Sequence, residues 1–115
     1  MNSEELREYC LSLKDVTESF PFDESTLVFK VGNKMFCLTS LEGDLSVNLK
    51  NEPEKNVELR ERHRAVKPGY HMNKKHWNTI EIDGSLPDEL IKTWIDDSYN
   101  LVFQNLPQKI KNEYR

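Results

Sequence analysis

The sequence lacks any run of eighteen apolar residues, so no segment is long enough to cross a membrane as an apolar helix. Its first ten residues, MNSEELREYC, are acidic and amphipathic, whereas a signal peptide starts with basic residues and an apolar stretch. Cysteine is scarce: Cys10 and Cys37 are too far apart for a CxxC site, and each has apolar neighbours. We therefore expect a cytoplasmic protein without a membrane partner and with two buried free thiols; a disulfide is the alternative.

Motifs for catalysis and metal binding are also missing. The sequence has no glycine-rich phosphate loop, and its Ser and Thr residues have no recognisable nucleophile setting. The spacing of His63, His71 and His76 matches no compact ligand pattern, and Lys74 and Lys75 would repel a cation. We expect no enzymatic activity, no cofactor and no metal.

The chain does contain enough apolar material for one compact domain, residues 1–115. Apolar residues make up 37% of it, including two Trp, four Tyr and five Phe. The net charge is −4, which on average disfavours nucleic acid, but the stretch 60–76 holds six Lys or Arg residues against one acid. Such clustering creates a local positive field on an acidic protein, and a solvated helix end followed by a turn gives the same count.

The hydrophobic pattern predicts the order of the elements. Asn2 with Glu5 indicates a capping box before a first helix, and Gly32-Asn33 indicates a hairpin turn. In the second helix Val57 should be buried, with Leu59 and Ala65 as further candidates. The predicted elements are a first helix, a loop at 16–24, strands at 26–31, 34–41 and 45–50, a helix from Pro53, a hairpin with arms at 70–72 and 76–83, a long helix after Gly84-Ser85 and one more turn after Pro107.

This order, α-β3-α-β2-α, predicts the α+β class. The expected architecture is a two-layer α/β sandwich, in which a mostly antiparallel sheet is covered on one face by helices.

The densest group of polar and planar side chains is the stretch PGYHMNKKHW, residues 68–77. The tip of the predicted hairpin carries Asn73, Lys74 and Lys75, and these lysines can neutralise phosphate. Flanking rings can stack on bases; alternatively, Tyr70 and Trp77 anchor the hairpin by packing while the lysines keep its tip soluble. The candidates for stacking, or for lining a small-ligand pocket, are Tyr70, His71, His76, Trp77 and Asn78.

Over nearly its whole length the sequence resembles the MmcQ/YjbR-like family of small bacterial proteins. The resemblance rests on SFPFDESTLVFKVGNKMFCL, on PGYHMNKKHWNTI and on a terminal amphipathic helix ending in LP; residues 70–79, YHMNKKHWNT, are its most specific part. It implies an α-β3-α-β2-α sandwich similar to type III secretion chaperones and to the C-terminal double-wing domain of the phage transcription factor MotA. It also implies DNA binding, by analogy of fold.

In a double-wing arrangement the open sheet presents a concave face to DNA. We expect weak, salt-sensitive contacts with the DNA backbone from this face and from the second hairpin. The expected contact residues are Lys30, Lys34, Asn48, Lys50, Asn73, Lys74 and Lys75. The alternatives are a protein- or peptide-interaction module, which the acidic bulk favours, and a small-ligand binder. Carboxylates such as Asp23 or Asp44 among the lysines would favour the protein partner.

Overall fold

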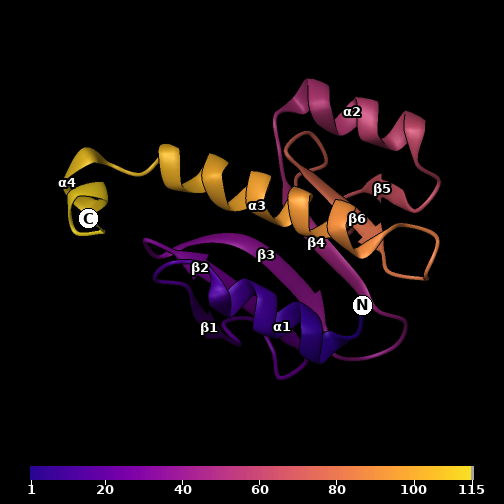
Figure 1. Cartoon of the computed structure of the whole chain (residues 1–115), viewed down its shortest axis with the longest axis horizontal. Helices are drawn as coiled ribbons and strands as arrows, with labels where there is room; N and C mark the ends of the chain where they lie inside the picture. Colours follow the sequence, from indigo (N-terminus) through magenta and orange to yellow (C-terminus); the bar gives the residue numbers. More distant parts are fainter. Residues whose placement is uncertain (115) are drawn as a thin grey trace.

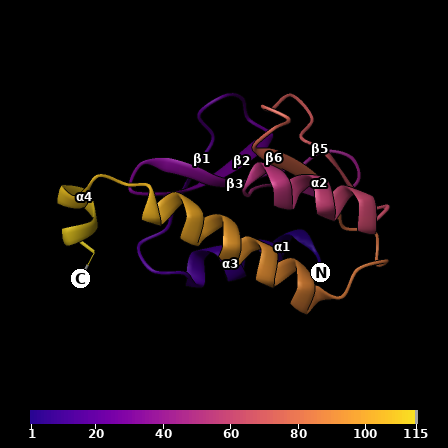
Figure 2. The same cartoon turned by 90° about the horizontal axis from the view of Figure 1, so that it is seen from above.

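The computed structural model describes residues 1–114. Its sheet has six antiparallel strands in the order β1-β2-β3-β4-β6-β5. Helices α1 and α3 lie on the same face of this sheet (Figures 1 and 2). The elements are α1 (Ser3–Ser12), β1 (Thr17–Ser19), β2 (Thr26–Val31), β3 (Lys34–Ser40), β4 (Ser46–Lys50), α2 (Pro53–Arg62), β5 (Val66–Pro68), β6 (Trp77–Glu81), α3 (Asp88–Gln104) and α4 (Gln108–Asn112). The predicted α+β class is confirmed.

The main core fills the space between the helices and the sheet. Leu6 of α1, Phe29 of β2 and Ile95 of α3 are fully buried in it. The predicted capping box fixes the start of α1, because the Glu5 amide donates to Asn2 Oδ1 at 2.8 Å and the Asn2 amide to Glu5 Oε1 at 3.2 Å. Cys10 and Cys37 are buried free thiols, as expected, with their Sγ atoms 3.8 Å apart. Burial raises the pKa of the Cys37 thiol, so it stays protonated and unreactive.

The first correction concerns residues 16–24, which the sequence pattern assigned to a loop. Thr17–Ser19 form β1, which pairs with Lys30–Val28 at the edge of the sheet. Arg7 of α1 binds Glu18 through two hydrogen bonds of 2.8 and 2.7 Å. This strand carries no apolar alternation, so its formation depends on contacts that sequence periodicity does not report.

The second hairpin also differs from the prediction. Its first strand is Val66–Pro68, and residues 70–72 belong to the loop that connects β5 to β6. Val66 is buried opposite Ile80, which fixes the register. Pro68 is tolerated because β5 is an edge strand.

In α2 the buried positions are shifted from those expected. Leu59 and Ala65, which follows the helix, are buried, but Val57 is 48% exposed. The face toward the sheet instead carries Asn56, which is 1% exposed and whose Nδ2 donates to the carbonyls of Asn51 and Lys75. An apolar count overlooks a buried asparagine, and this explains the error.

The predicted Gly32-Asn33 turn is present, with φ of +56° at Gly32. Buried Leu106 packs against it, so a Cβ at this position would lie 2.5 Å from Leu106 Cδ1. We expect Gly32→Ala to lower the free energy of unfolding by about 2 kcal/mol in urea denaturation. Gly43→Ala is the control, because Gly43 has φ of +72° but open space around it. Equal losses in the two variants would show that Leu106 does not constrain the turn.

Candidate binding groove on the open sheet face

The face of the sheet turned away from α1 and α3 carries a groove of about 1080 Å³. Its apolar part is a second small core on this side of the sheet. Trp77 is 7% exposed and packs with buried Val28 and Leu38, and half-buried Met35 and Met72 cover them. We call these five residues the floor cluster; Met35, Leu38 and Met72 line the groove directly.

Two loops that are distant in the sequence border the groove. They connect β1 to β2 and β5 to β6, and both project from the side opposite α1 and α3 (Figure 2). The first contributes Phe22 and the second Tyr70, which are 64% and 71% exposed. Large aromatic side chains with that much exposure, on both borders of one concavity, are typical of a contact surface.

Local hydrogen bonds hold the first loop in place. The amides of Ser25 and Thr26 donate to Asp23 Oδ1 at 2.9 and 2.7 Å. These backbone hydrogen bonds lower the pKa of Asp23 from its ordinary value. The Asp23 carboxylate, which lines the groove, therefore carries its charge throughout the neutral range.

The second loop is held from below by buried asparagines, which we call the anchor network. Asn56 Nδ2 donates to the Lys75 carbonyl at 3.1 Å, and Asn78 Nδ2 donates to the Asn56 carbonyl at 3.2 Å. Arg60 Nε donates to Asn78 Oδ1 at 2.7 Å, and its Nη2 donates to the Lys74 carbonyl. Both asparagine side chains are 1% exposed, so α2 positions the loop through satisfied buried polar groups.

The upper part of this loop presents two rings to the groove. Tyr70 and His71 have ring centroids 4.0 Å apart, and the Tyr70 amide donates to Thr79 Oγ1 at 2.9 Å. His71 has φ of +58°, a left-handed conformation that is costly for a residue with a Cβ. A strained residue held at the border of a concavity supports a role in binding.

The groove is acidic at one end. Ser46 of β4 pairs with Glu81 of β6, and the neighbouring loops bring Asp23, Asp44 and Asp83 to the same end of the sheet. Among the described residues that line the groove, Lys67 is the one lysine or arginine, and it forms an ion pair with Glu81.

The five lysines predicted to contact DNA are not gathered around this groove. Lys30 and Lys50 lie at the opposite end of the sheet from the carboxylates. Lys34 is the cross-strand partner of Val31, a core residue, so it leaves the sheet on the helix-covered side. Lys74 Nζ donates to the Gly69 carbonyl at 3.0 Å, and Lys75 is exposed on the loop. None of the five belongs to the lining.

The two predicted asparagines have different places. Asn48 lines the middle of the groove and accepts a hydrogen bond from Thr79. Asn73 shapes the β5–β6 loop, because its Oδ1 accepts from the Lys75 amide at 2.9 Å. Asn48 is therefore placed for binding, whereas Asn73 has a structural task.

Of the five residues proposed for stacking or for a pocket, two line the groove. Tyr70 and His71 do so, whereas half-buried His76 does not. Trp77 is buried in the floor cluster, and Asn78 is buried on the core side in the anchor network. The side chains of Trp77 and Asn78 are therefore unavailable for stacking on a base. Trp77 and Asn78 are therefore interior residues, and composition alone could not assign them to the interior.

The basic stretch 60–76 is likewise divided among local partners. Arg60 belongs to the anchor network, Arg62 Nε lies 3.5 Å from Glu58 Oε1, and Lys67 pairs with Glu81. Acidic groups thus neutralise Arg62 and Lys67, whereas Arg60 holds the loop through uncharged acceptors.

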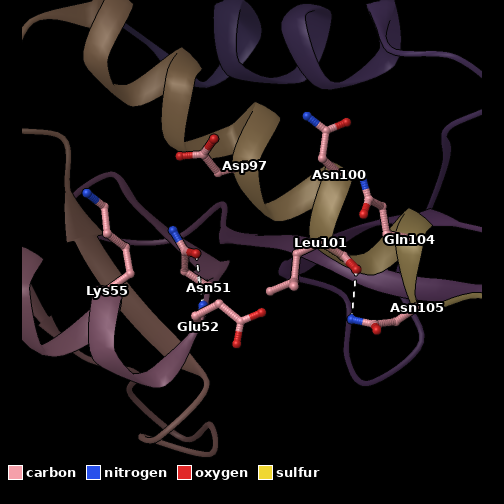
Figure 3. A pocket seen from close by; sticks show the side chains of 8 residues that line it. All are labelled: Asn51, Glu52, Lys55, Asp97, Asn100, Leu101, Gln104 and Asn105. Carbon is pink, nitrogen blue, oxygen red and sulfur yellow. Dashed lines mark hydrogen bonds between the residues drawn. The ribbon is translucent and has the colours of Figure 1, made fainter.

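Figure 3 shows a second, more open hollow of about 570 Å³ between the start of α2 and the C-terminal half of α3. Its lining is polar, and several of its groups already have partners. The Glu52 amide donates to Asn51 Oδ1 at 2.8 Å, and Asn105 Nδ2 donates to the Leu101 carbonyl at 2.9 Å. Burial raises the pKa of Asp97 here. Within residues 1–114 no buried side-chain nitrogen or oxygen lacks a partner, so nothing in this hollow points to a ligand.

Two further searches concern metals and membranes. Residues 1–114 contain no group of three or more His, Cys, Asp or Glu side chains arranged to hold a metal ion. No helix in this part of the chain combines the length and the apolar character needed to span a bilayer.

The sequence pattern predicted some of the residues that line the groove. Strand alternation placed Ser46 and Asn48 on the open face, and the same alternation could have added Thr79. It could not reveal Met35, because a β-bulge next to Phe36 shifts the register of β3 against β2. The loop residues Phe22, Asp23 and Asp83 come together only through the fold.

The fold and the groove define a small α+β domain with an open antiparallel sheet, and comparisons with known proteins identify its family. The family model described as YjbR matches residues 11–101. Protein YjbR of Escherichia coli K12 is 36% identical over 95% of this chain and 93% of its own length. Protein YbdF of Escherichia coli O157:H7 is 36% identical over 97% of this chain and 93% of its own length. The chain belongs to the YjbR family.

Solved structures share this architecture. The crystal structure of Deinococcus radiodurans protein DR2400, with domain DUF419, has a TM-score of 0.91 and 42% identity, covering 96% of this chain and 86% of that one. A crystal structure of a Pseudomonas syringae protein, target PsR293, has a TM-score of 0.78 and 27% identity, covering 89% of this chain and 99% of that one. The layered arrangement of helices and open sheet is thus common to both.

Proposed function

We propose that this protein is a non-catalytic binding module whose groove holds an extended segment of a partner protein. Apolar side chains on the floor, polar side chains between them and exposed rings at the borders suit a polypeptide, which offers the same alternation of chemistry. The free thiols of Cys10 and Cys37 support a reducing, cytoplasmic location for this module.

The observation that carries the proposal is the distribution of carboxylates. Asp23, Asp44, Glu81 and Asp83 line the concavity around a lysine that Glu81 already neutralises. A phosphate backbone placed there would face like charge, whereas a polypeptide would not. In a double-wing arrangement this concave face would contact DNA. Its charge suits a peptide better than a phosphate backbone.

DNA binding is the second candidate, and one observation favours it. Lys30, Lys50 and Lys75 form no ion pair within residues 1–114, so they can contact phosphates. Contacts of this kind would be weak, independent of base sequence and strongly weakened by salt.

The test is a selection of seven-residue peptides displayed as a random library against the wild-type protein. We expect the recovered peptides to bind Phe22→Ala at least about tenfold more weakly than wild type, because Phe22 borders the groove. Phe20→Ala is the control: Phe20 lies in the same loop and is 47% exposed but does not line the groove. Its affinity should match wild type in fluorescence anisotropy titrations.

Two results would contradict the proposal. One is a library that yields no binder; the other is a set of binders that are equally weakened by both phenylalanine substitutions. Labelled duplex DNA is titrated in parallel at low and moderate salt. Salt-sensitive binding that is lost in Lys30→Ala/Lys75→Ala, with no peptide recovered, would favour the DNA candidate instead.

A further inference from the structure

The open face is electrically polarised along the strands. At one end, the loops that precede β2, join β3 to β4 and follow β6 carry Asp23, Asp44 and Asp83. At the other end, where β2 and β4 finish, Lys30 lies opposite Met35 and Lys50 lies opposite Trp77. A ligand lying along the groove therefore meets negative charge at one end and the apolar floor toward the other, where the two lysines lie outside the lining.

The length of the groove sets the spacing of the ligand groups. Ser40 and Met35 both line it and pair with Thr26 and Lys30 of β2, which are four positions apart and therefore separated by about 13 Å at roughly 3.3 Å per residue. Leu38 lies between them. In an extended peptide every second side chain faces the same way, so the first, third and fifth side chains of a seven-residue segment cover this distance of about 13 Å on the floor.

The shape of the face favours a peptide over a second copy of this chain. Opposite charges at the two ends would also complement a copy turned around. However, two copies placed face to face would bring their grooves together, and the loops that carry Phe22 and Tyr70 project at the borders of each groove. The two faces are therefore not complementary in shape. A single extended strand fills a concavity that two concave faces leave empty.

We propose that the groove selects segments carrying a lysine or arginine at the Asp44 end, followed at alternate positions by apolar side chains over Met35, Leu38 and Met72. This inference rests on the proposed function and adds the chemistry and orientation of the partner. The basic group approaches Asp44 and Asp83, and the apolar groups cover the part of the floor cluster that is still half-exposed. The amide nitrogen of Asn48, at mid-groove, donates to no acceptor within residues 1–114 and is available to a peptide carbonyl.

The test compares two charge reversals in one loop. Asp44 lines the groove, whereas Glu42, two residues earlier and also exposed, does not. The seven-residue library is selected against wild type, Asp44→Lys and Glu42→Lys. We expect lysine or arginine to be enriched at one end of the peptides recovered with wild type and Glu42→Lys. Asp44→Lys should lose that enrichment and bind the wild-type peptides about tenfold more weakly at low salt.

The outcomes separate this inference from the proposed function. If the recovered peptides depend on Phe22 but show no basic enrichment, or bind Asp44→Lys and Glu42→Lys equally, the charge selection is wrong and the groove remains the binding site. If no peptide is recovered, both fail. Loss of the Asp44→Lys effect at 1 M salt, where surface charges are screened, would further support the inference.

Discussion

Trp77→Ala is expected to lower the free energy of unfolding by about 3–5 kcal/mol, the largest effect of any substitution outside the main core. Trp77 is 7% exposed and is the largest member of the floor cluster, packing with Val28 and Leu38 on the open face. Its removal leaves a cavity that the strands below cannot fill. Urea denaturation gives the value, because Trp94, buried in the main core, remains as the fluorescent reporter.

The matched control is Val57→Ala. Val57 is apolar but 48% exposed on α2, so its truncation should change the free energy by no more than about 0.5 kcal/mol. A loss below about 1 kcal/mol for Trp77→Ala would mean that the open face is not a second core. The groove would then lack the rigid floor on which the proposed function depends.

Asn78→Ala is expected to cost about 2–3 kcal/mol and to loosen the β5–β6 loop. The Asn78 side chain joins the Asn56 carbonyl to Arg60 Nε, and Arg60 in turn holds the Lys74 carbonyl. Without it the Asn56 carbonyl loses one donor, Arg60 Nε loses its acceptor, and the attachment of the loop to α2 is weakened. Hydrogen exchange of the amides in residues 69–76 should accelerate by more than the global loss of stability requires.

The control for this substitution is Asn100→Ala. Asn100 lies exposed on α3 at the second hollow (Figure 3), so its removal should leave both the stability and the loop exchange unchanged. Unchanged exchange in the loop of Asn78→Ala would contradict the role of the anchor network. The loss of free energy of unfolding in that variant would then have a cause other than the attachment of the loop.

Local signals predicted much of the fold. The Asn2–Glu5 capping box, the Gly32-Asn33 turn and the apolar alternation around Val47 and Leu49 each depend on neighbours in the sequence, and each is found in the structure. What failed were elements held by distant partners. β1 depends on Arg7 and β2, and β5 depends on Ile80, so neither had a periodicity of its own.

The candidate site was less accessible to sequence reasoning than the fold. The stretch YHMNKKHWNT directed attention to the correct loop, but its residues have three separate tasks. Tyr70 and His71 face the groove, Trp77 forms its floor, and Asn78 holds the loop from the core side. Composition could not separate these tasks, because burial depends on which side of the sheet each residue faces. Asp23 and Asp44 were named from the sequence as carboxylates that would favour a protein partner, but their position at one end of the groove beside Asp83 could not be predicted, because three loops create that end together.

The methionine methyl groups offer the most direct measurement of whether the groove binds a polypeptide. The chain has three methionines: Met35 and Met72 line the groove, whereas Met1 does not. In protein labelled with ¹³C at the methionine methyl groups, titration with a recovered peptide should shift the Met35 and Met72 signals and leave Met1 unchanged. Shifts confined to Met1, or a bound peptide that moves none of the three signals, would contradict the account.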